Sequence, residues 1–512
     1  MTATLRPMTS LAFRLASVCA GVSAPVILAL ACSEHPRTTQ AALVDNADGG
    51  GDALLAPPPI VRSEGEATLE PLREACHFQA GAWPAQTIGK EYPLGSDIPV
   101  DHIVVIMQEN RAFDHYLGRL VAQGYYEAGD FTADGGADGG RGSGFSSSTA
   151  LDVPPAGWSN TDVDGAVVTP HPDNEYCYGV NHSWAAMHDD YDNGRLDHFV
   201  TQNDPDGQRT FFYEDDTVIP FYYALANTFA VGDQYHCSVL SSTWPNRYFL
   251  MAATSFGIGD NSFCTLDTAA HPAPQIFSLL DEGGHTWKDY TDGPHMLQFF
   301  PQFGFEKSTI AHYSDLKCGL FADIKNGTLP DVSFVMGDEV TESSDEGPSD
   351  LPGIGGLVVE QIVRALFASP IWKSTAVFIT YDENGGLADH VEPAPACAPD
   401  SYKPHDGNGN PLTPGGFDQT GFRVPFIVVS PYARAHFVSH VVHDHTSITR
   451  FIEARFGLPA LTARDANAAP PMEMFDFQHP AFEKAPTISA HTTVPSAILS
   501  QCGQSYAPTC GG

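Results

Sequence analysis

Three short apolar runs, each followed directly by polar residues, constrain the fold of this 512-residue chain more than any other feature. The runs cover residues 103–107, 376–380 and 425–429. They are followed by Gln-Glu-Asn-Arg, Tyr-Asp-Glu-Asn-Gly-Gly and Ser-Pro-Tyr. Buried parallel strands appear as continuous apolar runs, and the residues that follow them meet at one edge of a sheet. The pattern therefore predicts an α/β fold with a central, mostly parallel sheet.

Two helical patterns accompany these runs. One follows His445 and ends at Gly457, a residue typical of helix C-termini. The other ends before Pro370 and repeats apolar residues at helical spacing, namely Leu357, Val358, Ile362, Val363, Leu366 and Phe367. Because this second helix precedes the strand at 376–380, it predicts a crossover unit of a parallel sheet.

Charge limits the partners of the protein. Lys and Arg total 25 against 62 Asp and Glu, a formal net charge of −37. Such a field repels polyanions, so no nucleic-acid partner is expected, whereas zwitterionic phospholipids and small phosphate esters remain candidate substrates. The chain lacks G-x-S-x-G, P-loop and H-E-x-x-H motifs, the usual indications of carboxyl-ester hydrolysis, nucleotide-driven chemistry and zinc proteolysis. No feature of the sequence determines an oligomeric state.

Residues 1–31 have the features of an export signal. Basic Arg6 and Arg14 precede an apolar stretch over 22–30 that ends in small residues; a buried N-terminal helix is the alternative interpretation. Cys32 is a candidate for acylation, which would attach the protein to a membrane, although Ala29 stands where a Leu is usual. We therefore expect a periplasmic, extracellular or lipid-anchored protein at the cell envelope.

The remaining chain divides into a flexible tether over 32–75 and a catalytic domain over 76–512. The domain carries a Gly- and Asp-rich surface insertion at about 127–165 and a Pro-rich tail at about 478–512 that wraps the surface. Eight cysteines beyond Cys32 are an even number, which predicts structural disulfides in an exported chain: Cys76, Cys177, Cys237, Cys264, Cys318, Cys397, Cys502 and Cys510.

Acidic residues follow two of the predicted strands. Glu109-Asn110 and Asp382-Glu383 are distant in sequence, but parallel strands bring their carboxyl ends to the same edge. Converging carboxylates repel one another unless a cation joins them, so a metal site is predicted. Oxygen ligands favour Ca²⁺, Mg²⁺ or Mn²⁺, and an added imidazole would admit Zn²⁺. The alternative is that these acids cap the following helices.

Thr243 lies in a polar turn that also contains Asn246 and Arg247. A metal-activated hydroxyl at this position could attack phosphorus, while Asn246 and Arg247 could bind phosphoryl oxygens. From the local sequence alone, a turn-forming threonine is the favoured interpretation, and a structural salt bridge of Arg247 is as well supported as phosphate binding.

His182 and His390 are the best imidazole candidates. Either could protonate a leaving oxygen or hold phosphate, and Asp389 could orient His390, bind substrate or ligate a metal. The alternative for each histidine is a structural role.

These motifs, in their order along the chain, resemble the bacterial phosphoesterase family that contains non-haemolytic-type phospholipases C and a group of acid phosphatases. Residues 108–118 resemble its E-N-R-S-F-D-H-Y-F-G motif, residues 243–247 its T-x-P-N-R turn, and residues 381–391 its Y-D-E-x-G-G…D-H-V segment. Residues 421–425 and 445–447 resemble later landmarks, so the resemblance runs from about residue 100 to about 477.

The resemblance implies an alkaline-phosphatase-like three-layer α/β sandwich with long loop insertions. It also implies a divalent metal on Glu109, Asn110, Asp382 and Glu383, transient phosphorylation of Thr243, and His182 near the phosphate. The first expectation is phospholipase C activity on phospholipids. An acid phosphatase on soluble phosphomonoesters is the alternative, and a non-catalytic surface-binding lipoprotein is the second alternative.

The chain departs from the family pattern at one position. Many relatives have D-x-H-P before the long helix, whereas this chain has Gly347 in place of that histidine. The departure leaves open which group protonates the leaving oxygen, and His390 is a candidate for that role.

Overall fold

A computed structural model describes residues 60–129, 150–173, 178–261, 275–291, 316–337 and 352–494, with a few further positions that include Glu346. The expected export signal, Cys32, Gly347 and four of the cysteines (Cys177, Cys264, Cys502 and Cys510) lie outside the described residues.

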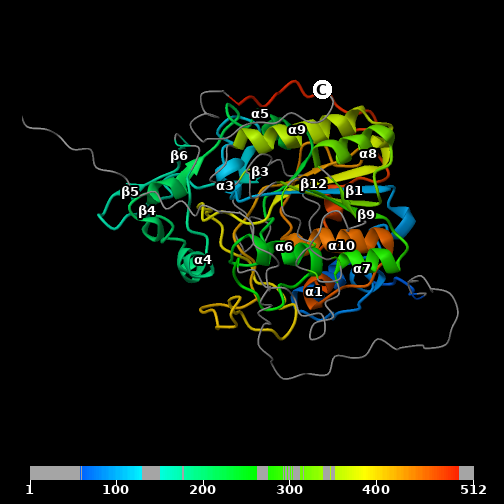
Figure 1. Cartoon of the computed structure of the whole chain (residues 1–512), viewed down its shortest axis with the longest axis horizontal. Coiled ribbons are helices and arrows are strands. Elements are labelled where there is room, and N and C mark those ends of the chain that lie inside the picture. The colour runs from blue at the N-terminus through cyan, green and yellow to red at the C-terminus, as the bar shows by residue number, and fades with distance from the viewer. Residues whose placement is uncertain are drawn as a thin grey trace, which may run out of the picture.

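A central sheet of eight described strands organises the fold (Figure 1). Its order is β10-β9-β11-β1-β12-β13-β8-β14, and every neighbouring pair is parallel except those that involve β13. The predicted mostly parallel α/β sheet is therefore confirmed. The strands are β1 (His102–Gln108), β8 (Ala230–Gly232), β9 (Trp287–Thr291), β10 (Tyr313–Ser314), β11 (Val332–Met336), β12 (Thr375–Tyr381), β13 (Phe426–Val429) and β14 (Phe437–Ser439).

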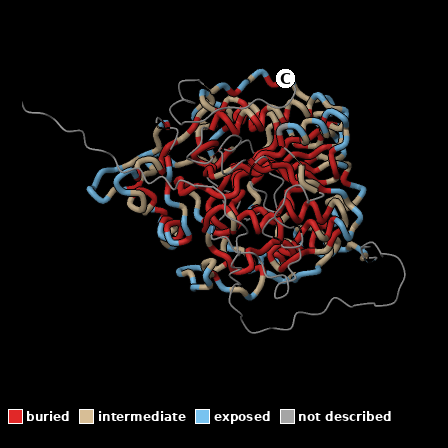
Figure 2. Tube along the Cα trace, in the orientation of Figure 1, coloured by how far each residue is buried: buried red, intermediate tan, exposed pale blue. Residues whose placement is uncertain are grey.

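Helices cover both faces of the sheet, which makes three layers (Figure 1). One layer contains α5 (Pro220–Thr228), α8 (Phe321–Asn326) and α9 (Pro352–Ala368), and the other contains α1 (Glu66–Glu74), α6 (Thr243–Ala252), α7 (Ile276–Glu282) and α10 (His445–Phe456). Both predicted helices are thus present as α9 and α10. Figure 2 shows buried residues concentrated along the sheet and the helix surfaces that face it.

The direction of β13 differs from the sequence prediction. Its apolar residues form a strand as predicted, but the strand runs antiparallel to β12, with Val377 opposite Val429. Ser430 therefore lies near the start of β12, where its hydroxyl donates to the Thr375 carbonyl at 2.9 Å. The residues after β13 therefore do not lie at the sheet edge that carries Glu109 and Asp382. The loop before β13, which contains Arg423, lies at that edge. An apolar run does not encode direction, because strand direction depends on the connecting segments.

The segments expected to be peripheral contain folded parts. Helix α1 lies within the expected tether, and Cys397 forms a disulfide with Cys76 just after it. In the insertion, β2 (Glu127–Gly129) pairs with β3 (Ala150–Asp152), and β4 (Asn160–Thr161) pairs with β5 (Val167–Val168). The tail runs beside α9, where Arg364 donates to the Ile488 carbonyl at 3.0 Å.

Cysteine chemistry corrects one expectation. Cys318 is disulfide-bonded, in addition to the Cys76–Cys397 pair. Cys237, however, is a free and buried thiol that packs in the hydrophobic core. The prediction that all eight cysteines form disulfides is therefore wrong, because a free cysteine also behaves as a small apolar side chain. Among the described residues, no helix has the length and apolar composition needed to span a bilayer.

Candidate active site

The ends of β1 and β12 bring the predicted acidic residues together. Gln108 lies opposite Tyr381 in the parallel register, and the Asp382 N–H donates to the Gln108 carbonyl at 3.0 Å. Glu109 and Asp382 are thus the first residues after two neighbouring strands. The convergence predicted from sequence is a direct consequence of this register.

Arg247 joins these two carboxylates from the helix layer. Its guanidinium lies 3.2 Å from the Glu109 Oε1 and 3.2 Å from the Asp382 Oδ2, and its side chain is fully buried. Thr243 is the first residue of α6, one helical turn before Arg247, and is 4% exposed. Side chains four residues apart share one helix face, so Thr243 lies on the same face of α6 as Arg247.

Glu383, the residue after Asp382, lies near His182. Glu383 is fully buried, and burial raises the pKa of its carboxyl to about 8 against the opposing effects of the Gly385 N–H and Arg247. His182 Nε2 lies 3.8 Å from the Glu383 Oε1. His182 Nδ1 is 2.8 Å from the Val180 carbonyl, so Nδ1 carries the proton and Nε2 the lone pair. Burial lowers the pKa of His182, which favours this neutral form.

Asn246 stabilises the loop that precedes Thr243. Its Oδ1 accepts from the Val239 N–H at 3.0 Å, and its Nδ2 donates to the carbonyls of Ser241 at 2.8 Å and Ser242 at 3.1 Å. The fully buried carboxamide therefore orients the start of α6. This geometry favours a positioning role over the predicted direct contact with phosphate.

His445 is a positioning residue that spacing arguments missed. Its Nε2 donates to the Asp382 carbonyl at 2.7 Å, and its Nδ1 accepts from the Tyr235 hydroxyl at 3.0 Å. Burial lowers the pKa of His445 to about 4, so the ring is neutral at physiological pH. The position of His445 at the start of a predicted helix was visible in the sequence, but its contact 63 residues away was not.

The matching family model is the Phosphoesterase family, and it covers residues 100–459, which include all of these residues. This chain belongs to the phosphoesterase family. The family places it among hydrolases that act on phosphate esters.

Two relatives of the phosphoesterase illustrate the match. Non-hemolytic phospholipase C of Burkholderia pseudomallei is 32% identical over 412 residues, which cover 70% of this chain and 55% of that protein. Phospholipase C A of Mycobacterium tuberculosis is 31% identical over 463 residues, which cover 82% of this chain and 86% of that protein. A solved alkaline phosphatase superfamily protein from Vibrio parahaemolyticus matches with a TM-score of 0.32 and 13% identity over 60% of this chain and 71% of that chain.

The donor set of the phosphoesterase site suits a hard divalent cation. Glu109, Asp382 and Glu383 offer carboxylate oxygens, and buried Asn110 offers an amide oxygen from the same strand end as Glu109. Oxygen donors of this kind hold Mg²⁺, Ca²⁺ or Mn²⁺, and the nearby His182 would extend the range to Zn²⁺. Arg247 supplies positive charge to two of the carboxylates, so part of their mutual repulsion is already offset.

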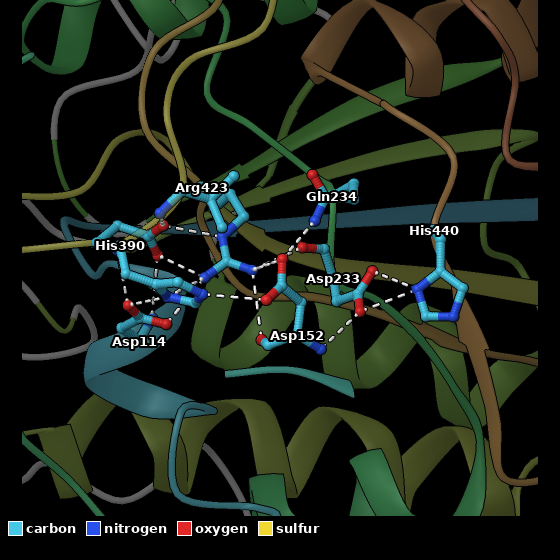
Figure 3. Close-up of polar contacts among 9 residues, drawn as sticks. Asp114, Asp152, Asp233, Gln234, His390, Arg423 and His440 are labelled. Atoms are coloured by element: carbon cyan, nitrogen blue, oxygen red, sulfur yellow. Dashed lines mark hydrogen bonds and ion pairs between the residues drawn. The ribbon is translucent and has the colours of Figure 1, made fainter. Parts of the chain in front are cut away.

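His390 belongs to a separate ionic network on Arg423 (Figure 3). Its Nδ1 lies 2.7 Å from the Asp114 Oδ2 and its Nε2 lies 3.0 Å from the Asp152 Oδ1. Arg423 donates to Asp389 and to Asp114, each at 2.8 Å. Both ring nitrogens of His390 are thus engaged by carboxylates, which favours a doubly protonated, positioning histidine over the predicted proton donor to substrate.

The same network revises the roles expected for Asp389 and the insertion. Asp389 pairs with Arg423 inside the protein, where it is fully buried, rather than with substrate. Asp152 comes from strand β3 of the expected surface insertion, yet it is only 2% exposed and connects to Gln234 (Figure 3). The network therefore fastens the insertion to the body of the phosphoesterase. Its charge pairs span 276 residues between Asp114 and His390, so sequence spacing gives no signal for them.

The protonated state of His390 predicts a pH-dependent stability. Burial alone lowers the pKa of His390, but the Asp114 carboxylate, reinforced by Asp152 and opposed by Arg423, raises it from 6.5 to about 9. A raised folded-state pKa stabilises the fold fully below about 6.5, and this contribution, roughly 3 kcal/mol, is lost as pH rises through about 9. Urea unfolding should show a steeper loss of unfolding free energy between pH 7 and 10 for the wild type than for His390→Gln. Equal slopes would contradict this assignment.

Glu346 lies beside the position at which the family histidine is replaced. Its Oε1 accepts from the Tyr222 hydroxyl at 2.6 Å, and its Oε2 accepts from the hydroxyls of Tyr116 at 2.8 Å and Tyr381 at 2.6 Å. Burial raises the pKa of Glu346 to about 7 against these hydrogen bonds. Glu346 is therefore a buried structural acceptor, and Gly347 itself is outside the described residues.

Proposed function

We propose that the protein is an exported phospholipase C that cleaves a phosphodiester through a phosphothreonine formed at Thr243. The observation that carries this proposal is the position of Thr243 at the N-terminus of α6, one turn before Arg247, which contacts Glu109 and Asp382. A helix N-terminus favours negative charge, so α6 would stabilise a phosphoryl group on its first residue.

The chain's own residues would divide the work as follows. Glu109, Asn110, Asp382 and Glu383 would hold a divalent cation, which when bound lowers the pKa of the Thr243 hydroxyl and neutralises charge on the phosphoryl oxygens. Asn246 orients the loop before Thr243, and His445 orients the Asp382 backbone. Thr243 would attack phosphorus in line and expel an alcohol, and water would then cleave the phosphothreonine.

We assign to His182 the protonation of the leaving oxygen. It is neutral, its Nδ1 proton is held by the Val180 carbonyl, and its side chain is 28% exposed, so Nε2 would first accept the proton that the Thr243 hydroxyl releases and would then give it to the leaving oxygen. His390 lacks this freedom because both of its nitrogens face carboxylates. A histidine with one held nitrogen and one accessible nitrogen suits proton transfer.

A phospholipid is the proposed substrate, which the names of the bacterial relatives support. The net charge of −37 disfavours anionic surfaces, so a zwitterionic headgroup is preferred. The test compares products from phosphatidylcholine vesicles and from a soluble phosphomonoester. We expect release of phosphocholine at a rate well above that of inorganic phosphate. Faster release of inorganic phosphate from the monoester would instead support an acid phosphatase.

Export is the proposed location. The Cys76–Cys397 disulfide supports it, because such bonds persist in oxidising compartments. Attachment through acylated Cys32 is part of this proposal, and mass spectrometry of the purified N-terminus tests it. A mature chain that begins at Cys32 with attached acyl chains is the expected result for the anchored form. A chain that starts elsewhere without lipid would contradict anchoring.

A further inference from the structure

His115, Asp173 and Glu214 meet inside the protein, and none of them is among the residues assigned to catalysis. One nitrogen or oxygen from each lies within 4.8 Å of the others, and all three side chains are buried. They share no residue with the strand-end set of Glu109, Asn110, Asp382 and Glu383. Nothing in the proposed phosphoryl transfer uses them.

Backbone hydrogen bonds hold the three residues in place. His115 lies in α3 (Phe113–Tyr116), and its carbonyl accepts from the Glu214 N–H at 2.8 Å. Glu214 follows β7 (Phe212–Tyr213), which pairs in parallel with β6 (His171–Pro172). Asp173 follows β6, and its N–H donates to the Tyr213 carbonyl at 3.0 Å. The three side chains are therefore positioned by the main chain before any of them binds a ligand.

The surroundings of the His115 imidazole indicate that this cluster binds a ligand. Its side chain is 0% exposed, and among the described residues neither ring nitrogen has a hydrogen-bond partner. Nε2 lies 3.9 Å from the Glu214 Oε1, which is beyond hydrogen-bonding distance but suitable for two ligands of one cation. Leaving a buried polar group unsatisfied costs about 1–3 kcal/mol, so an ion between these atoms would remove a real penalty.

The charges around the cluster favour a divalent cation. Burial, together with Arg111, lowers the pKa of His115 well below its usual range, so its nitrogen carries a lone pair. Burial, together with Asp173, raises the pKa of Glu214 well above its usual range, which shows how costly a second negative charge is there. Ionised Asp173 and Glu214 would place two negative charges beside the single positive charge of Arg111, and a bound cation would offset the remainder.

We propose that His115, Asp173 and Glu214 form a second, structural metal site that takes a divalent transition metal such as Zn²⁺. One imidazole and two carboxylates match borderline cations better than Ca²⁺ or Mg²⁺, which prefer oxygen alone. A cavity of about 380 Å³ lies next to this part of the chain, lined by residues that include His115, Arg119 and Tyr213. The site would tie α3 to the two residues that directly follow β6 and β7.

The test measures zinc bound to the full chain after chelation, reloading with Zn²⁺ and desalting. Four proteins are compared: wild type, Glu214→Gln, Asp382→Asn and the double variant. Glu214→Gln should lower zinc content by about one ion per chain in both backgrounds, because it removes one ligand of a three-residue site. Asp382→Asn changes a ligand of the proposed catalytic metal site and leaves His115, Asp173 and Glu214 intact. Loss of zinc from the catalytic site can therefore be distinguished from loss of zinc from the second site.

Equal zinc content in Glu214→Gln and wild type would overturn the proposal. Gln replaces the protonated carboxyl without adding charge, so the variant is expected to fold, and circular dichroism checks this. A second measurement leaves Glu214 unchanged: zinc-edge X-ray absorption of reloaded Asp382→Asn, which keeps all three residues of the proposed site. One imidazole among oxygen ligands is expected, and a zinc shell without imidazole would overturn the assignment.

Discussion

Thr243→Ala is expected to abolish phosphodiester hydrolysis while leaving the fold intact. The substitution removes the only atom that the proposed mechanism uses as nucleophile, and loss of a covalent nucleophile lowers kcat by about 10⁴-fold or more. The fold should survive because Thr243 is the first residue of α6, and its hydroxyl is not the helix cap. We expect the free energy of unfolding to change by about 1 kcal/mol. Steady-state assays with phosphatidylcholine and urea unfolding measure the two effects.

Two control variants make this prediction specific. Thr243→Ser keeps a hydroxyl and should retain measurable turnover. Thr228→Ala removes another partly buried threonine, whose hydroxyl bonds to the Ala224 carbonyl at 2.7 Å in α5 on the opposite layer, and it should leave kcat unchanged. Acid-quenched wild-type protein should carry phosphate on Thr243 by mass spectrometry. Turnover by Thr243→Ala within about tenfold of wild type would refute the nucleophile.

Removal of the divalent cation is expected to have the second largest effect. Chelation of the wild type should lower kcat by about 10³-fold or more, because positioned charge supplies much of the stabilisation of a phosphoryl transition state. Adding Mg²⁺, Ca²⁺, Mn²⁺ or Zn²⁺ back, one at a time, should restore activity with one of them. Asp382→Asn should not be restored at the same concentrations, because it lacks one ligand and weakens the contact to Arg247.

The matched control for this second prediction is Asp418→Asn. Asp418 is an exposed carboxylate on a loop, so its loss changes net charge by the same amount without touching the strand ends. It should keep the wild-type response to chelation and to added cations. Full activity of the wild type after exhaustive chelation, with metal content measured as zero, would show that the carboxylates serve another purpose, such as holding Arg247.

The local pattern of the sequence was sufficient for three of the eight described strands of the sheet, for two of the helices that cover it and for the acidic residues at its edge. Continuous apolar runs identify β1, β12 and β13, and helical spacing identifies α9 and α10, because burial of one face is encoded by neighbouring residues. Glu109 and Asp382 lie close together because each is the first residue after one of two neighbouring parallel strands. Family motifs added the interpretation of Thr243 as a nucleophile.

Tertiary structure alone decided the features that depend on contacts between distant segments. The antiparallel direction of β13, the free thiol of Cys237 and the hydrogen bonds of Asn246 to the loop before Thr243 each depend on contacts between separate groups, and local sequence does not encode those contacts. The residue type of His390 suited a catalytic role. In the structure, the carboxylates of Asp114 and Asp152 engage both of its ring nitrogens, although these residues are 276 and 238 positions away in the sequence. Residue type and spacing thus determined the chain's elements and the chemistry available to it, whereas folding determined which polar groups neutralise one another and which remain available to a ligand.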